Sequence, residues 1–298
     1  MTELEARAVD GPPTQVLLVD CPDQRGLIHA ITGVLMRHQA NILSNDEFVD
    51  WETQRFFMRS EFVTTGGDDA TRRGTGSEAL VAELRGLLPE PANVRLARAG
   101  EHKIAVLATT EHHCLGELLM RHAHGDLGAS IATVVSNHAT LAPLTERFGI
   151  PFHHVPHQGI TRPEHEEAVQ RVLAQHELDY LVLAKYMRIL SPEFIARYRD
   201  RIFNIHHSFL PAFVGANPYR QAFDRGVKII GATAHFVTEA LDEGPIIAQS
   251  IVPIDHSYRP DEMARAGRDV EKIVLAKALK LVFEDRVFLS GKRTIVFD

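Results

Sequence analysis

Apolar positions in the first third of the chain follow two periods. Spacings of three and four residues predict amphipathic helices over 27–39 and 78–89. Compact or alternating apolar runs predict four strands, at 15–21, 41–50, 55–63 and 92–100. The order β-α-β-β-α-β is typical of a ferredoxin-like unit. The Gly-, Asp- and Thr-rich segment 64–77 predicts a mobile loop before the second helix.

The pattern changes after Glu101, where continuously apolar strands alternate with helices. This alternation predicts a larger, Rossmann-like parallel sheet with helices on both faces, so the whole chain belongs to the α/β class. We therefore predict two domains, 13–98 and 102–298. Parallel sheets of this kind bind ligands at the carboxyl ends of their strands. Catalytic or ligand-binding residues are therefore expected after Leu183 and around the strand 202–206.

Composition narrows the class of protein. Apolar residues make up 45% and charged residues 24% of the 298 residues, which is an ordinary globular balance. The formal charge of −7 argues against a nucleic-acid partner. The two cysteines, Cys21 and Cys114, favour a reducing compartment, and the chain lacks both a leader pattern and a membrane-length apolar run. We expect a cytoplasmic protein with no membrane partner.

Motifs exclude some enzyme classes. The first strand of the second domain is followed by neither G-x-G-x-x-G nor a Walker A motif, which argues against dinucleotide and nucleoside triphosphate enzymes. Adjacent histidines on a strand point to opposite faces, so at most one of His206 and His207 is expected in a common site. His153 and His157 have no carboxylate or cysteine nearby, and a surface loop is favoured over a metal site. No metal and no cofactor are expected.

The segment from Asn204 to His206 is the strongest catalytic candidate. The two residues are two positions apart in an extended segment, so both side chains leave the same face about 6–7 Å apart. An amide and an imidazole that converge in this way can bind a developing oxyanion, although such residues also satisfy backbone groups at strand ends. The acid-rich turn 238–245 contains Asp242, and a carboxylate that reached His206 would orient the imidazole and favour its protonated form.

Asn204-x-His206 followed by Asp242 in an L-D-x-G-P loop resembles the family of formyltransferases that use 10-formyltetrahydrofolate. The resemblance covers nearly all of 102–298 and implies that Asn204, His206 and Asp242 are catalytic. It also implies a set of residues around the folate and its formyl group: Met187, Arg188, Ile189, Leu190, His235, Val237, Thr238 and Glu239. Lys185 and Arg188 are candidates to meet the glutamate tail of folate, although side chains at strand ends are commonly just solvated. His235 fits a packed structural histidine equally well.

Within this family, the strings LAKYMRILSPEF, NIHHSFLPAF, GATAHFV and LDEGPII resemble the formyltetrahydrofolate deformylases most. Transformylases of the family carry a Gly-Ser-rich loop that cradles the phosphate of their amine substrate. The corresponding segment, 109–115, lacks glycine and contains Glu111. This difference favours water as the acceptor and therefore hydrolysis to formate and tetrahydrofolate. Two alternatives remain open: formyl transfer to an amine, and a catalytically silent folate or amino-acid sensor.

The first domain resembles ACT domains through CPDQRGLIHAI, NIL and FFMR. The resemblance implies a small amino-acid effector, glycine or methionine, and a homo-oligomer. It also implies effector contacts at Asp23, Gly26, Leu27, Asn41 and Ile42. Gly26 is expected at a tight turn that needs a positive φ or close backbone approach. A pure dimerisation module is the alternative reading of this domain.

Overall fold

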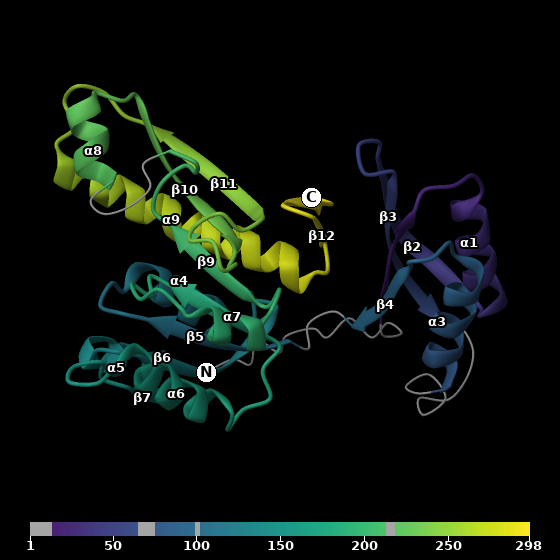
Figure 1. Cartoon of the computed structure of the whole chain (residues 1–298), viewed down its shortest axis with the longest axis horizontal. Helices are drawn as coiled ribbons and strands as arrows, with labels where there is room; N and C mark the ends of the chain where they lie inside the picture. The colour runs from purple at the N-terminus through teal and green to yellow at the C-terminus, as the bar shows by residue number, and fades with distance from the viewer. Residues whose placement is uncertain (1–13, 65–74, 99–101, 213–217) are drawn as a thin grey trace, which may run out of the picture. The chain divides into compact units, whose positions relative to one another are not determined.

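The computed structural model of the chain describes residues 14–64, 75–98, 102–212 and 218–298 (Figure 1). The chain divides into two compact units that separate between Ala99 and Gly100, and each is described by itself. None of the helices in the described ranges combines the length and the apolar character needed to cross a membrane.

The first unit has the expected βαββαβ order and an antiparallel sheet with strand order β2-β3-β1-β4. Its elements are β1 (Gln15–Pro22), α1 (Leu27–Arg37), β2 (Ala40–Asp50), β3 (Arg55–Thr64), α3 (Thr75–Leu87) and β4 (Asn93–Arg98). The helices pack on one face of the sheet around Leu17, Ile31 and Leu84. The loop prediction for 64–77 is wrong at its end, since α3 already begins at Thr75, and residues 65–74 lie outside the described ranges.

The second unit contains a seven-stranded sheet with order β11-β10-β9-β8-β5-β6-β7. Its strands are β5 (His102–Ala108), β6 (Ala129–Ser136), β7 (Phe152–His154), β8 (Tyr180–Ala184), β9 (Ile202–His206), β10 (Ile229–Phe236) and β11 (Ile246–Pro253). Its helices are α4 (His113–Ala123), η1 (Ala139–Leu141), α5 (Ala142–Glu146), α6 (Arg162–Leu173), α7 (Pro192–Arg197), α8 (Pro218–Arg225) and α9 (Pro260–Phe283). A hairpin of β12 (Val287–Ser290) and β13 (Arg293–Val296) follows.

The sheet departs from a purely parallel arrangement at one strand. Strands β5 to β9 run parallel, whereas β10 is antiparallel to both β9 and β11. The reason lies in α8, which packs with Ile230, Ile254 and Met263 beside the sheet's outer strands rather than crossing between β9 and β10. Without a crossover, the next strand returns in the opposite direction.

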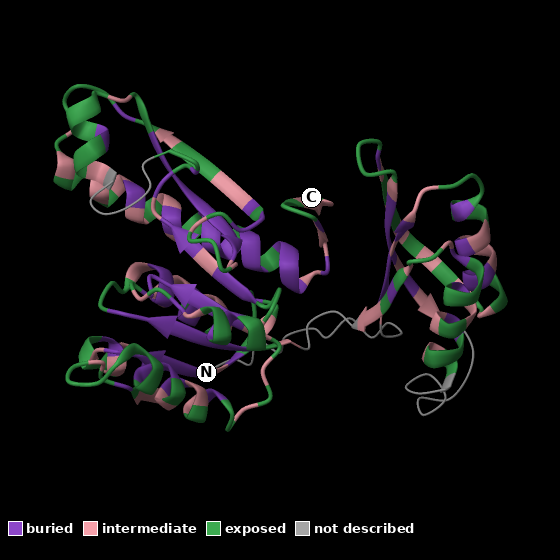
Figure 2. Cartoon of the chain, viewed as in Figure 1, coloured by how far each residue is buried: buried purple, intermediate pink, exposed green. Residues whose placement is uncertain are grey.

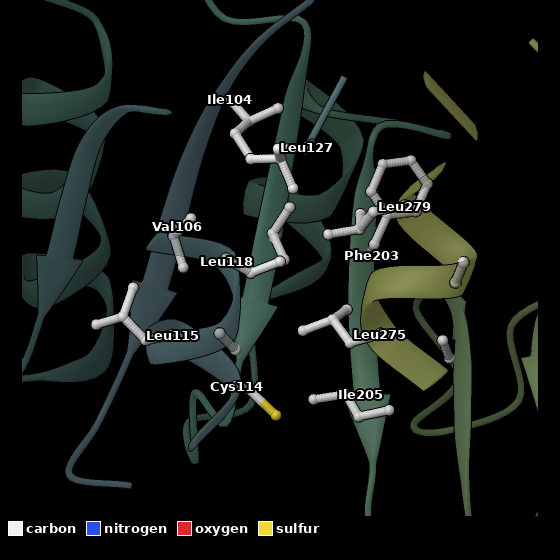
Figure 3. Close-up of a cluster of buried hydrophobic side chains, with 14 of the residues drawn as sticks. Ile104, Val106, Cys114, Leu115, Leu118, Leu127, Phe203, Ile205, Leu275 and Leu279 are labelled. Atoms are coloured by element: carbon white, nitrogen blue, oxygen red, sulfur yellow. The ribbon is translucent and has the colours of Figure 1, made fainter. Parts of the chain in front are cut away.

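Two apolar layers cover the two faces of this sheet. One layer joins α4 and α9 to the sheet, and Figure 3 shows Phe203 and Ile205 of β9 beside Leu275 and Leu279 of α9. The other layer joins α6 and α7 to the opposite face and includes Ile202. The strands between these layers are largely buried (Figure 2). Because side chains alternate along β9, Asn204 and His206 lie on the same face as Ile202.

Candidate active site

A cavity of about 440 Å³ lies where the segment after β8, strand β9 and the β10–β11 connection meet. It brings together every residue expected from sequence in the catalytic and folate-binding sets. These lining residues are Met187, Arg188, Ile189, Leu190, Asn204, His206, His235, Val237, Thr238, Glu239 and Asp242. Met187 and Ile189 are 61% and 60% exposed, which leaves apolar surface in the cavity wall available to a flat aromatic ligand.

The segment that carries Met187 is held at both ends by side-chain hydrogen bonds. The backbone N–H of Met187 donates to Thr109 Oγ1 at 3.0 Å. At the other end, Ser191 donates to the carboxylate of Glu166 from its backbone N–H, at 2.8 Å, and from its hydroxyl. Ser191 also caps α7 by accepting from Phe194 N. These contacts fix one wall of the cavity before a ligand arrives.

Asn204 is positioned by His235, which faces it directly across the β9–β10 pairing. Its Nδ2 donates to His235 Nε2 at 3.2 Å, and His235 Nδ1 donates to the carbonyl of Phe236 at 2.8 Å. Burial lowers the pKa of His235, which favours the neutral ring that can accept from Asn204. One N–H of the Asn204 amide is thereby oriented, and the second is left for a ligand.

His206 and Asp242 form an ion pair, with His206 Nδ1 3.2 Å from Asp242 Oδ2. Burial acts to raise the pKa of Asp242, but the hydrogen bond and charge of His206 outweigh burial and lower it. Asp242 Oδ1 lies 3.7 Å from His235 Nε2, which is beyond hydrogen-bond distance. The other nitrogen of His206, Nε2, is buried and has no hydrogen-bond partner among the described residues.

The loop that carries Asp242 owes its path to Gly244. A Cβ on Gly244 would lie 1.7 Å from the carbonyl oxygen of Phe236, so only glycine allows this approach. The backbone N–H of Phe236 donates to Pro245 O at 2.9 Å. Asp242 itself has a φ of 57°, a left-handed conformation that is uncommon outside glycine. Gly244 and Pro245 therefore hold the loop close to Phe236.

Two residues of the cavity wall were misjudged from sequence. His207 was expected on the face opposite His206, yet their rings stack with centroids 4.9 Å apart. The reason is that β9 ends at His206, so strand alternation does not reach His207. Burial, with help from the nearby Lys185, lowers the pKa of His207 to about 4. Lys185 was expected in solvent or on the folate tail, but it is buried and paired with Glu271.

One cluster in the described ranges has the composition of a metal site: His113, Cys114 and Glu271, with ligand atoms within 4.8 Å of one another. The ammonium of Lys185, 3.1 Å from Glu271 Oε2, already supplies a positive charge there. Burial also raises the pKa of the Cys114 thiol well above its ordinary range, whereas a metal ligand must be the thiolate. These residues therefore fit an ion-pair network better than a metal ion.

In the first unit, the turn after β1 has the conformation expected from sequence. Gly26 has a φ of 88°, which confirms the positive φ, and it forms the N-cap of α1. Asp23 donates its backbone N–H to Gln54 O at 2.9 Å. The side chain of Leu27 is buried in the core of the unit, so it is not free to contact an effector.

Asn41 and Ile42, also expected as effector contacts, lie at the opposite end of the sheet. Ile42 pairs with Phe62, and Phe62 pairs with Gln15 at the start of β1. Asp23 instead follows the far end of β1. Asn41 and Ile42 are therefore not brought next to the Asp23 turn within one chain, and their role as effector contacts stays a prediction.

Comparisons with known proteins agree with this architecture. The formyl transferase family model matches residues 102–279, and the ACT domain model matches residues 15–72. A formyltetrahydrofolate deformylase from Haemophilus influenzae is 51% identical over 95% of this chain and 98% of its own length. The crystal structure of a formyltetrahydrofolate deformylase from Pseudomonas syringae pv. tomato has a TM-score of 0.91 and 38% identity, covering 98% of this chain and 96% of that one.

A glycinamide ribonucleotide transformylase from Symbiobacterium toebii aligns with a TM-score of 0.64 and 31% identity. It covers 67% of this chain and 95% of that chain. The deformylases, in contrast, match the chain over both of its domains. The chain therefore belongs to the formyltetrahydrofolate deformylase family.

Proposed function

We propose that this chain hydrolyses 10-formyltetrahydrofolate to formate and tetrahydrofolate. One observation carries the proposal: His206 is oriented by Asp242 through Nδ1, while its Nε2 has no partner among the described residues and Asn204 lies on the same face of β9. This is the arrangement that an acyl-transfer site needs, because an amide and an imidazole can together bind an oxyanion. The names of the similar deformylases support the same substrate.

In the proposed mechanism, the pteridine lies between the Met187–Leu190 segment and the Val237–Glu243 segment, and the N10-formyl group lies beside Asn204. Water held by Asp242 and His206 attacks the formyl carbon. The remaining N–H of Asn204 and the Nε2–H of protonated His206 donate to the oxyanion. The water gives a proton to the Asp242 carboxylate, and Asp242 returns that proton to N10 as the C–N10 bond breaks.

The test is an assay with purified enzyme and 10-formyltetrahydrofolate, without any amine, that measures formate and tetrahydrofolate. Equal amounts of both products, lost in the His206→Ala variant, are expected for a hydrolase. Formate-free turnover that depends on an added amine would indicate a transferase instead. Substrate binding with no product from the wild type would indicate a sensor.

For the first domain, we propose regulation by a small amino acid, supported by the ACT model match and the Gly26 turn. The test is the rate of the full chain at subsaturating folate, with and without glycine or methionine. An unchanged rate, with no heat of binding for either amino acid, would favour a dimerisation module. The expected homo-oligomer and cytoplasmic location remain predictions.

A further inference from the structure

A second group of charged side chains lies behind the catalytic imidazole. Glu271 of α9 is 1% exposed and accepts from three donors. His113 Nε2 lies 2.8 Å and Lys185 Nζ 3.1 Å from its Oε2, and the hydroxyl of Tyr219 lies 2.7 Å from its Oε1. This set is called the Glu271 cluster below. Its carboxylate is held charged by the protein's own donors, with a pKa lowered from 4.5 to about 2 against the effect of burial.

The fold builds this cluster from separate segments. Lys185 follows β8, His113 begins α4, and Tyr219 belongs to α8. Lys185 adopts a left-handed φ of 62°, a conformation that persists only where the surroundings impose it. Tyr219 reaches Glu271 across Gly267, because a Cβ on Gly267 would lie 1.9 Å from the tyrosine hydroxyl oxygen. The strained backbone of Lys185 and the need for glycine at 267 indicate that the fold specifically positions these side chains around Glu271.

The Glu271 cluster is continuous with the reaction site. Lys185 lines the active cavity together with Asn204 and His206. His207 stacks on His206 and also lines a second cavity of about 210 Å³, whose wall includes Tyr219. Glu271 therefore lies behind the part of the cavity wall that Lys185 forms, and an amine that took the place of the Lys185 ammonium would enter from the reaction site.

From this juxtaposition we propose that Glu271 is an ammonium-binding site whose permanent occupant is Lys185, so that no amine acceptor can bind and water is left as the nucleophile. The inference rests on the proposed hydrolysis and names Lys185 as the residue that determines acceptor specificity. A buried carboxylate is the group that would hold the ammonium of an amine substrate. In this chain, the side-chain ammonium of Lys185 already lies there, with Nζ 3.1 Å from Glu271 Oε2.

The proposal predicts a new reaction once the tethered ammonium is removed. In Lys185→Ala, a small ammonium ion enters beside Glu271 and loses one proton to solvent through the neighbouring imidazoles. The free amine forms a bond to the formyl carbon, the C–N10 bond breaks, and a second amine proton moves to N10. The products are an N-formylamine and tetrahydrofolate, with one proton released, so atoms and charge balance without another reactant.

The experiment uses the full-length Lys185→Ala enzyme with 10-formyltetrahydrofolate and ethylammonium as the probe. A ligand of three heavy atoms binds no tighter than about 1 mM, so about 100 mM ethylammonium is needed. We expect N-formylethylamine at a level at least about tenfold above that of the wild type, and a melting temperature that ethylammonium raises. Lys185→Arg, which keeps the charge, and Lys185→Ala/Glu271→Gln, which removes the carboxylate, should show neither effect.

Lys185→Gly is the second variant, since it also removes the ammonium, and glycine adopts the φ of 62° at this position without strain. The same ethylammonium assay on this variant tests the proposal if Lys185→Ala is insoluble. Folded variants that form no N-formylethylamine and gain no stability from ethylammonium would overturn the proposal. So would insolubility of both variants with ethylammonium present, because a bound amine should restore the ion pair. Formate release by the wild type, measured in parallel, tests the proposed hydrolysis separately.

Discussion

Replacing Asp242 with asparagine tests the ion pair at the centre of the proposed mechanism. The substitution keeps the size of the side chain and an oxygen that can accept from His206, but it removes the charge. At the observed 3.2 Å and an effective dielectric constant of about 20, that charge stabilises the imidazolium by about 5 kcal/mol as an upper limit. This limit corresponds to a rate factor between about 10³ and 10⁴. Because Asp242 is 13% exposed and asparagine keeps the hydrogen bond, we expect kcat to fall by about 10²–10³.

The assay is formate release from 10-formyltetrahydrofolate under saturating conditions, with KM measured alongside. Glu243→Gln is the matched control, because Glu243 is an exposed carboxylate in the same loop and does not line the cavity. The loss should fall on kcat, since the charge matters most when the oxyanion forms. Turnover of Asp242→Asn within about threefold of the control would show that the ion pair does not carry the reaction.

The other predictions concern the residues that position this pair and the second charged cluster. Gly244→Ala should lower kcat by about 10–10², since its Cβ collides with Phe236 O and displaces the Asp242 loop; unchanged kinetics would contradict that reading. His235→Ala should lower kcat by about tenfold by freeing the Asn204 amide, with partial recovery in His235→Gln, as steady-state kinetics would show. Because the folded-state pKa of Glu271 is depressed from 4.5 to about 2, its stabilising contribution is complete above pH 4.5 and is lost as pH falls toward 2. Urea unfolding across that range should therefore show a shallower pH dependence in Glu271→Gln than in the wild type.

The parts of the site that follow from local geometry could be predicted from sequence. Asn204 and His206 share a face because the period of a strand is two, and their spacing alone indicates this. That Asp242 reaches His206 depends on two distant segments meeting, and only the family pattern indicated it. The parallel sheet was predictable from alternating strands and helices, but the reversal of β10 was not, because it depends on how α8 packs.

The Glu271 cluster was not predicted, because its ion pair joins two residues far apart in the chain. A signal was nevertheless present in the sequence. Glu271 lies on the buried face of α9, four positions after Gly267 and in line with Leu275. A carboxylate within an apolar stripe requires a buried partner, and Lys185 is that partner.

The chain positions of the proposed catalytic side chains have a consequence for how this family diversifies. The groups proposed to handle the formyl carbon, from Asn204 to Asp242, all come from one continuous stretch built on β9, β10 and the loop that follows. The groups proposed to determine the acceptor include His113 and Glu271, which come from segments well before and well after it. The residues that act on the formyl donor can therefore be inherited together, while the residues that select the acceptor change independently. A family built in this way can acquire new acceptors, or exchange an amine for water, without rebuilding its formyl chemistry.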